Sequence, residues 1–163
     1  MKSFLLLTNK ENDMSTIIRN RKAYHDYEII EKLEAGVKLL GYEVKSIKEG
    51  KGTLQGAYIK ILDNTLVLLG FNLPIYSRAS TILNYDSTRT RKLLVHKNEL
   101  ETLKIKTERQ GYTIIPIKFY TKGNIIKIEI GLAKGKKKED KKRALIEAQV
   151  KRQVDIELKA QRR

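Results

Sequence analysis

A long alternation of apolar and polar residues lies between Tyr27 and Leu39. Apolar and aromatic side chains occupy most of the odd-numbered positions, and charged side chains occupy positions 28, 32, 34 and 38. A period of two predicts a β-strand with one face towards a core, and Gly36 predicts a bend within it. We therefore expect the odd-numbered side chains of this strand to share one face.

The rest of the chain up to Leu132 divides into short helices and strands. Helical spacing of apolar residues predicts the helices, and turn residues between β-prone runs predict the hairpins. The predicted elements are a helix over 40–50 ended by Gly50, a hairpin over 58–71 that turns at Asp63-Asn64, a polar loop up to Ser87, a helix over 99–110 capped by Asn98 and ended by Gly111, and strands over 112–120 and 125–132 joined through Lys122-Gly123-Asn124.

About five short strands, a few short helices and short turns favour a small closed sheet, because closure leaves no exposed strand edge. We predict a mainly β fold, an OB-fold-like closed antiparallel barrel over 17–133. A flexible extension over 1–16 precedes it, although Met14 opens a better-patterned segment than Met1 and is an alternative start. A basic tail over 134–163 follows it.

The composition of the chain changes after Leu132, and no aromatic residue follows. Within the tail, Ile146, Val150, Val154 and Leu158 recur every four residues among basic side chains. So narrow an apolar stripe buries little surface, and an isolated helix is costly to nucleate. We expect the tail to be largely disordered until it folds as a cationic helix on a partner.

The charge of the chain limits its partners. Its formal net charge is +15, with 34 basic residues against 19 acidic ones. Such a surplus favours a polyanionic partner, either nucleic acid or an anionic membrane surface. No apolar run is long enough for a membrane span or a secretory signal, and there is no cysteine, so we expect a cytoplasmic protein without membrane partners.

Residue patterns for catalysis are weak. The lack of cysteine and the wide separation of the two histidines argue against a metal site. In an extended chain, His25 and Asp26 would point to opposite faces, as would Glu31 and Glu34, so neither pair is expected to cooperate. We expect Glu34 to anchor a nearby cation or backbone amide. The segment 131–137 lacks the spacing of a phosphate loop, and we predict no catalytic residue, metal or cofactor.

Three basic clusters flank the predicted β elements. They are Arg19, Arg21 and Lys22; Arg89, Arg91 and Lys92; and Lys134, Lys136, Lys137, Lys138, Lys141, Lys142 and Arg143. One such cluster is usually a solvated face. Three of them favour RNA, because lysines neutralise phosphates while tyrosine rings stack on unpaired bases. The tyrosines available near them, each of which also fits ordinary packing, are Tyr24, Tyr27, Tyr42, Tyr58 and Tyr120.

Five strings of the sequence occur together and in order. They are NRKAYHDYEI, LEAGVKLLGYEVKSIKEGK, DSTRTRKLLVHKNEL, GYTIIPIKFY and IGLAKGKKKEDKK. From about residue 17 to residue 142 the chain resembles the small protein B (SmpB) family, the tmRNA-binding proteins of trans-translation. The resemblance implies an OB-like barrel with a flexible tail and no enzymatic activity.

The same resemblance implies a function. Family members bind the tRNA-like domain of tmRNA, increase its alanylation by alanyl-tRNA synthetase, and accompany it, with elongation factor Tu as an indirect partner, to ribosomes stalled on mRNA without a stop codon. The tail enters the vacant mRNA channel and folds into a helix. We expect the protein to act as a monomer.

The resemblance also implies roles for individual residues. Those matching positions associated with tmRNA recognition are Asn20, Glu34, Leu94 and Lys127, with Tyr24 and His25 from the same N-terminal string. The basic clusters add Arg21, Lys22, Arg89, Arg91, Lys92, Lys134 and Lys136 to the predicted RNA-binding set. The predicted decoding-centre and mRNA-channel set is Lys137, Lys138, Asp140, Lys141, Lys142, Arg143, Lys151 and Arg152.

The tail departs from the family at three positions. Lys142 replaces the usual arginine, Glu139 stands where some relatives have histidine, and Val150 stands where some have tryptophan. These departures put side-chain stacking at positions 139 and 150 in doubt.

Two other functions fit parts of the sequence. A ribosomal or translation-factor OB-fold protein that binds rRNA constitutively fits the charge and the barrel equally well, but not the ordered strings. A small RNA-processing enzyme would need a nucleophile, a metal cluster or an acid/base pair, and no convincing set of these is present.

Overall fold

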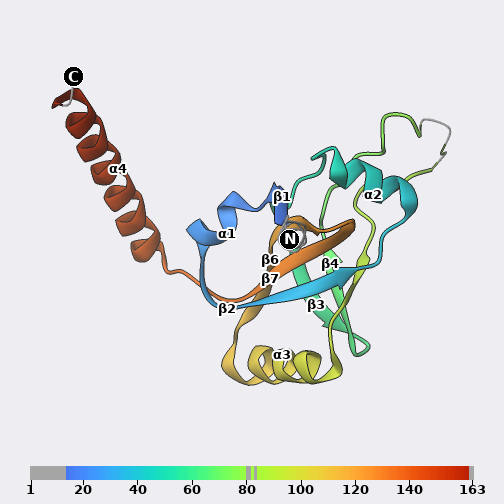
Figure 1. Cartoon of the computed structure of the whole chain (residues 1–163). Coiled ribbons are helices and arrows are strands. Elements are labelled where there is room, and N and C mark those ends of the chain that lie inside the picture. The colour runs from blue at the N-terminus through green and yellow to red at the C-terminus, as the bar shows by residue number, and fades with distance from the viewer. Residues whose placement is uncertain (1–13, 80–81, 83, 162–163) are drawn as a thin grey trace, which may run out of the picture.

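The computed structural model describes residues 14–79, 82 and 84–161 of the chain, shown as a ribbon in Figure 1. The elements in chain order are β1 (Met14–Arg19), α1 (Arg21–Asp26), β2 (Tyr27–Val37), α2 (Gly41–Lys48), β3 (Tyr58–Leu62), β4 (Thr65–Leu69), β5 (Arg91–Leu94), α3 (Lys97–Gln110), β6 (Thr113–Lys122), β7 (Ile125–Gly135) and α4 (Lys138–Gln161). Most of the predicted N-terminal extension, 1–13, lies outside the described residues, and its last residues, 14–16, belong to β1.

The strands form one antiparallel sheet that closes on itself. Its order is β1-β6-β3-β4-β5-β2-β7, and β6 also pairs with β7, so the strands from β6 to β7 make a closed ring to which β1 adds at β6. This confirms the predicted mainly β fold and is consistent with an OB-like architecture. The prediction missed β1 and β5, which are short strands of six and four residues.

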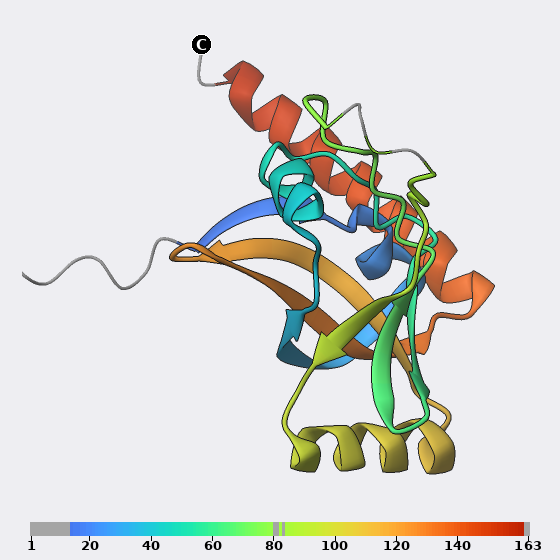
Figure 2. The same ribbon diagram turned by 90° about the vertical axis from the view of Figure 1, so that its right-hand side faces the viewer.

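The interior of the ring is the hydrophobic core. Leu68, Phe71, Phe119 and Ile128 have no exposed surface there, and the two phenylalanine rings lie 5.0 Å apart. Each such side chain contributes roughly 1.5 to 3 kcal/mol by leaving water. Helix α3 covers one end of the ring and α2 lies at the other, as the two views in Figures 1 and 2 show.

Local turn and cap residues act largely as predicted. Asp63 and Asn64 both have positive φ, 46° and 58°, which is the turn that matches the twist of a hairpin. Gly111 ends α3 with φ 66°. The predicted start of α3 is wrong by two residues, because His96 and not Asn98 is the N-cap residue: the Glu99 carboxylate accepts a hydrogen bond of 2.8 Å from the His96 N–H.

Strand β2 does not keep its odd-numbered side chains on one face, which corrects the prediction. Its register with β7 shifts, so that Ile29 pairs with Ala133 but Glu31 pairs with the neighbouring Leu132. Adjacent residues of β7 point to opposite faces of the sheet. The bulge therefore moves the odd-numbered side chains of β2 from one face of the sheet to the other. Ile29 packs under α1 with Ala133, whereas Leu33 packs against the core inside the ring.

The tail is a continuous helix, α4, which is the conformation expected of it on a partner. It follows directly on β7, which runs to Gly135, beyond the predicted end of the strand at Leu132. The helix projects from the ring on the side of α1 (Figure 1). The apolar side chains of Ile146, Val150 and Val154 are exposed, so the described part of the chain does not bury this stripe.

Candidate nucleic-acid interface

Three residues predicted to recognise RNA meet on the outer surface of the ring. Gly36 on β2 pairs with Leu94 on β5 and with Lys127 on β7. Glu34 lies two residues before Gly36, and its Oε1 is 3.5 Å from Lys127 Nζ. Leu94 is 60% exposed, and Gly36 has no side chain to cover it. Strand pairing thus assembles one surface from distant parts of the sequence.

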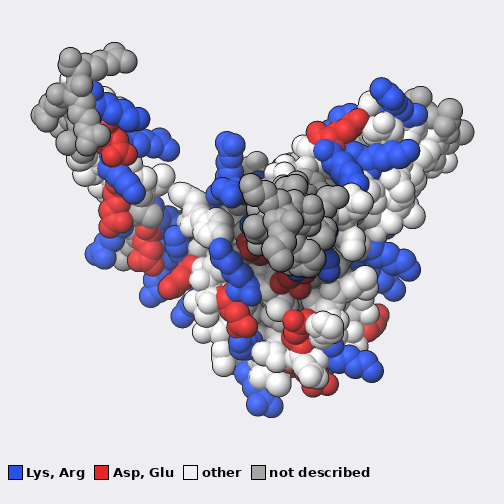
Figure 3. All heavy atoms as spheres, in the orientation of Figure 1, with Lys and Arg blue, Asp and Glu red and all other residues white. Residues whose placement is uncertain are grey.

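We call this surface the strand face and define it by Lys32, Glu34, Lys92, Leu94, Lys118 and Lys127. Lys32 and Lys118 are not among the residues predicted from the sequence, although the alternation in β2 puts Lys32 on the same side as Glu34. Lys118 Nζ lies 3.8 Å from Glu129 Oε1. Acidic and basic side chains are interspersed over this part of the molecule in Figure 3.

Glu34 is held in its charged form. It accepts a hydrogen bond from the Tyr120 hydroxyl, and the ammonium groups of Lys122 and Lys127 lie 3.7 and 3.5 Å away. The Tyr120 hydrogen bond and then these charges lower the pKa of Glu34. Burial and the bond to Glu34 raise the pKa of Tyr120. Glu34 is therefore a cation anchor, as expected.

Tyr120 is not one of the rings that could stack on a base, which corrects the prediction for this residue. It is only 3% exposed, and its hydroxyl is engaged by Glu34. Tyr24 and Tyr58 are exposed, each with a lysine ammonium, Lys32 or Lys60, within 5.5 Å of its ring centroid. The Tyr24–Lys32 contact links α1 to the strand face.

Asn20 supports the fold and has little surface for RNA. It is 7% exposed; its side-chain amide donates to the Pro116 carbonyl at 2.9 Å, and its backbone N–H donates to the Ile117 carbonyl at 2.8 Å. These bonds fix the start of α1 against β6. They leave the Asn20 side chain little surface for a direct contact with RNA, whereas its neighbours Arg21 and Lys22 are exposed.

His25 and Asp26 do contact each other, contrary to the prediction. Both lie in the last turn of α1 and not in an extended segment, and His25 Nδ1 is 2.9 Å from Asp26 Oδ1. Lys141 Nζ lies 3.3 Å from the same oxygen. The bond to His25 and then the Lys141 charge lower the pKa of Asp26.

The start of the tail is attached to α1. The Lys136 N–H donates to the Asp26 carbonyl at 3.0 Å, and Lys136 Nζ donates to the Tyr24 carbonyl at 2.9 Å. A polar cleft of about 430 Å³ lies beside this junction, lined by Glu28, Lys136, Asp140, Arg143 and Glu147. The predicted residues of α1 and of the tail are thus brought together.

The other predicted tail residues are mostly exposed. The exposed ones are Lys134, Lys137, Asp140, Lys142, Arg143, Lys151 and Arg152. The side chain of Lys138 is outside the part of the chain that the structure describes.

The middle basic cluster is divided by the alternation of β5. Arg91 points inwards and is 0% exposed, which rules out the predicted phosphate contact for it. Its Nε donates to Glu43 Oε1 at 3.0 Å and its Nη1 to the Phe71 carbonyl at 2.9 Å. Lys92 points outwards onto the strand face, and Arg89, which is partly exposed, is also bound to Glu43.

Glu43, Arg89 and Arg91 form a buried ion triad between α2 and the loop before β5. Burial alone would favour the neutral acid of Glu43. Hydrogen bonds from Arg89 and from the Leu40 N–H, with the charges of both arginines, outweigh it and lower the Glu43 pKa. No local pattern of residues indicates this triad, because Glu43 is distant in the chain from both arginines.

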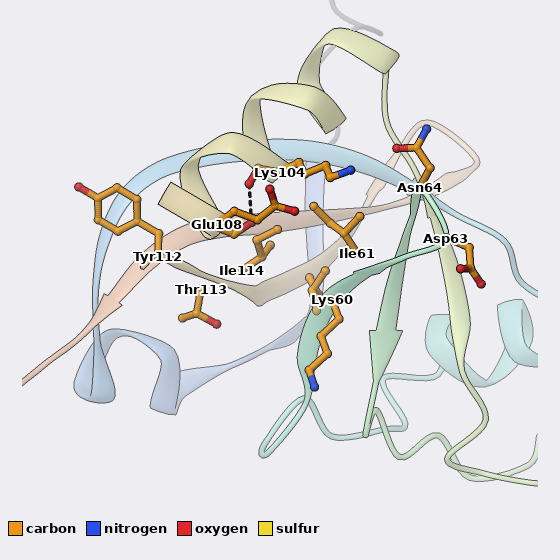
Figure 4. A pocket seen from close by; sticks show the side chains of 11 residues that line it. Lys60, Ile61, Asp63, Asn64, Lys104, Glu108, Tyr112, Thr113 and Ile114 are labelled. Carbon is orange, nitrogen blue, oxygen red and sulfur yellow. Dashed lines mark hydrogen bonds between the residues drawn. The ribbon is translucent and has the colours of Figure 1, made fainter. Parts of the chain in front are cut away.

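A hollow of about 530 Å³ lies between α3, β3 and β6. Its lining mixes charges, and the ammonium groups of Lys60 and Lys104 point in different directions (Figure 4). These groups do not converge on a common point as the polar groups of a small-molecule site do.

Neither a metal site nor a membrane span is found in the described residues. That part of the chain contains no group of three or more histidine, cysteine, aspartate or glutamate side chains placed to hold a metal ion. None of its helices is both long and apolar enough to cross a membrane.

A closed antiparallel ring with exposed lysines and tyrosines, continued by a cationic helix, defines a basic nucleic-acid-binding protein with an OB-like fold. The SmpB protein family model matches residues 17–160. The chain belongs to the SmpB family.

Individual relatives agree with this assignment. The SsrA-binding protein of Paraburkholderia xenovorans (strain LB400) is 47% identical over 127 residues, which cover 78% of this chain and 86% of that protein. The SsrA-binding protein of Clostridium novyi (strain NT) is 42% identical over 154 residues, 94% and 98% of the two chains. The predicted alternative, a constitutive rRNA-binding protein, is not favoured.

A solved structure described as "tmRNA-SmpB: a journey to the center of the bacterial ribosome" shares the fold. Its chain has a TM-score of 0.61 and 42% sequence identity with this one, and the match covers 80% of this chain and 95% of that chain.

Proposed function

We propose that the protein is an RNA-binding adaptor of trans-translation. It binds the tRNA-like domain of tmRNA, promotes its alanylation by alanyl-tRNA synthetase, and delivers it with elongation factor Tu to ribosomes stalled on mRNA without a stop codon. The observation that carries the proposal is the meeting of Glu34, Leu94 and Lys127 around Gly36, in a chain that matches the SmpB family over residues 17–160.

The strand face has the chemistry for folded RNA. Exposed Lys92 and the partly exposed Lys127 supply charge for phosphates, and Leu94 beside Gly36 offers an apolar contact for a sugar or an unstacked base. Tyr24, with Lys32 near its ring, adds a stacking platform at the edge of the face. Glu34 fixes the position of Lys127 and is not itself a phosphate ligand.

The tail has a separate role in this proposal. Its basic side chains suit the phosphate-lined mRNA channel, which is open only when no mRNA fills it. The exposed apolar stripe of α4 would be buried there. We assign the protein no catalytic step and expect a monomer, and this function implies a cytoplasmic location.

Truncation after Lys137 tests the division of labour. This end point keeps all of β7 and the bonds of Lys136 to α1, while it removes α4. Affinity for the isolated tRNA-like domain, measured by filter binding, should stay within about twofold because no phosphate contact of the strand face is lost. Peptide tagging in a reconstituted translation reaction with a nonstop mRNA should fall to background.

Lys127→Gln in the full chain is the matched control. It should weaken RNA binding and lower the log–log salt slope by roughly 0.7 to 0.9, and excess protein should restore tagging. Loss of RNA binding on truncation would contradict the proposal, as would normal tagging by the truncated chain.

A further inference from the structure

An acidic side chain, Glu129, lies in the middle of the strand face. In β7 it pairs with Glu34 of β2 on one side and with Lys118 of β6 on the other. Lys127 lies two residues earlier in β7 and therefore on the same face. Glu129 is not among the residues predicted from the sequence to bind RNA.

The pairing of Glu129 with Glu34 is unfavourable in itself. The Cβ atoms of directly opposite residues in an antiparallel pair are about 4.5 to 5.5 Å apart, and like charges placed in this way repel each other. Packing does not force the arrangement, because the side chains of Glu129 and Glu34 are 23% and 37% exposed. Neutral residues at these positions would give the face more attraction for RNA phosphates. Two adjacent carboxylates on such a surface therefore indicate a role other than attraction.

Cations surround the two carboxylates. Lys118 Nζ lies 3.8 Å from Glu129 Oε1, and Arg19 of β1 pairs with Lys118 at the end of the same row. Lys32 pairs with Gly131, two residues beyond Glu129 in β7, and so lies diagonally next to Glu129. Arg19 and Lys32 are exposed. The strand face thus has a negative centre with positive charges around it.

This charge pattern limits where RNA phosphates can lie. Phosphates are attracted to the basic side chains and repelled by Glu129, because unit charges a few ångströms apart interact even in water. A regular double helix carries phosphates at short intervals along both strands and cannot keep all of them away from the centre of the face. A folded RNA can present a ribose or a base there instead.

We propose that Glu129 determines specificity by excluding RNAs that would place a phosphate at the centre of the strand face. The RNA admitted is the tRNA-like domain of tmRNA, whose phosphates would lie over the surrounding basic residues. The inference rests on the proposed function and deepens it, since it assigns the discrimination against other RNA to one residue. Selectivity of this kind comes from repulsion of the wrong partner and adds no contact to the right one.

The test compares Glu129→Gln, which removes the charge, with Glu129→Asp, which keeps it, and with Glu101→Gln, which removes one charge from an exposed position on α3. Affinity is measured by filter binding for the isolated tRNA-like domain and for an unrelated RNA stem-loop of equal length. Glu129→Gln should bind the stem-loop roughly threefold to tenfold more tightly, and the gain should shrink as added salt screens the charges. Its affinity for the tRNA-like domain should stay within about twofold. Glu129→Asp and Glu101→Gln should bind both RNAs as the wild type does.

Equal tightening of both RNAs by Glu129→Gln would overturn the inference, because it would show a general effect of charge. So would an unchanged affinity for the stem-loop, or a gain as large with Glu129→Asp. Failure of the proposed function looks different, since the wild-type protein would then bind the two RNAs with equal affinity. Urea denaturation of the three variants checks that the fold is intact.

Discussion

Glu43→Gln should destabilise the protein more than any change on its surface. The Glu43 carboxylate is fully buried and accepts hydrogen bonds from Arg89 Nε at 2.8 Å, Arg91 Nε at 3.0 Å and the Leu40 N–H at 2.8 Å. The substitution keeps the size of the side chain but removes its charge. Arg89 is partly exposed and can be hydrated, whereas Arg91 is 0% exposed and has no access to water.

The size of the effect follows from this burial. Removing one partner of a buried ion pair costs about 3 to 5 kcal/mol, because the remaining charge stays uncompensated in a medium of low polarity. Arg91 keeps its bonds to the carbonyls of Phe71 and Ser87, at 2.9 and 3.2 Å, so it cannot turn outwards without breaking them. For a chain of this length such a loss lowers Tm by about 6 to 20 °C.

Urea denaturation followed by circular dichroism measures the free energy of unfolding of each variant. The set is wild type, Glu43→Gln, Arg91→Met and the double variant. The loss of stability in the double variant should be smaller than the two single losses added together, by at least about 1 kcal/mol. The reason is that the double variant leaves no unpaired buried charge. A loss below about 1 kcal/mol for Glu43→Gln would refute the reasoning, since it would show that other groups compensate the charge of Arg91.

The same carboxylate makes stability depend on pH. The pKa of Glu43 in the folded state is below its ordinary value of 4.5. The stability it provides is therefore fully present above that ordinary value and is lost as the pH falls through the folded-state pKa. Wild type should lose stability in this acid range by more than Glu43→Gln does.

Two further changes test the interface. Tyr120→Phe removes the hydroxyl that donates to Glu34. The pKa of Glu34, followed by NMR titration, should then rise towards its ordinary value, and acid destabilisation should begin at a higher pH. An unchanged pKa of Glu34 would contradict the hydrogen bond. Asp26→Asn removes the negative partner of Lys141. The distance distribution between spin labels on β3 and on the middle of α4 should therefore be broader than in a Glu28→Gln control. Equal distributions would show that Asp26 does not hold the tail.

Much of the secondary structure is encoded in short stretches of sequence. The Asp63-Asn64 turn and Gly111 are visible locally because each favours the positive φ that its position requires. The alternation in β7 is visible because one face of that strand lies against the core throughout. The net charge and the ordered family strings likewise need no coordinates.

Packing between distant segments decided the rest. Arg89, Arg91 and Lys92 look equivalent in the sequence. Only the packing of Arg89 and Arg91 against an acid 46 and 48 residues away makes those two structural. Asp26 meets His25 because residues 21–26 form a helix, whose Ala23 packs against Ile115 on β6.

The strand face exists only because β2 pairs with β5 on one side and with β7 on the other. Short-range patterns set the conformation of each segment, since they depend on neighbouring residues. Which polar groups lose their water, and which remain free to bind RNA, depends on strand pairing across the whole ring, and the tertiary structure alone determines it.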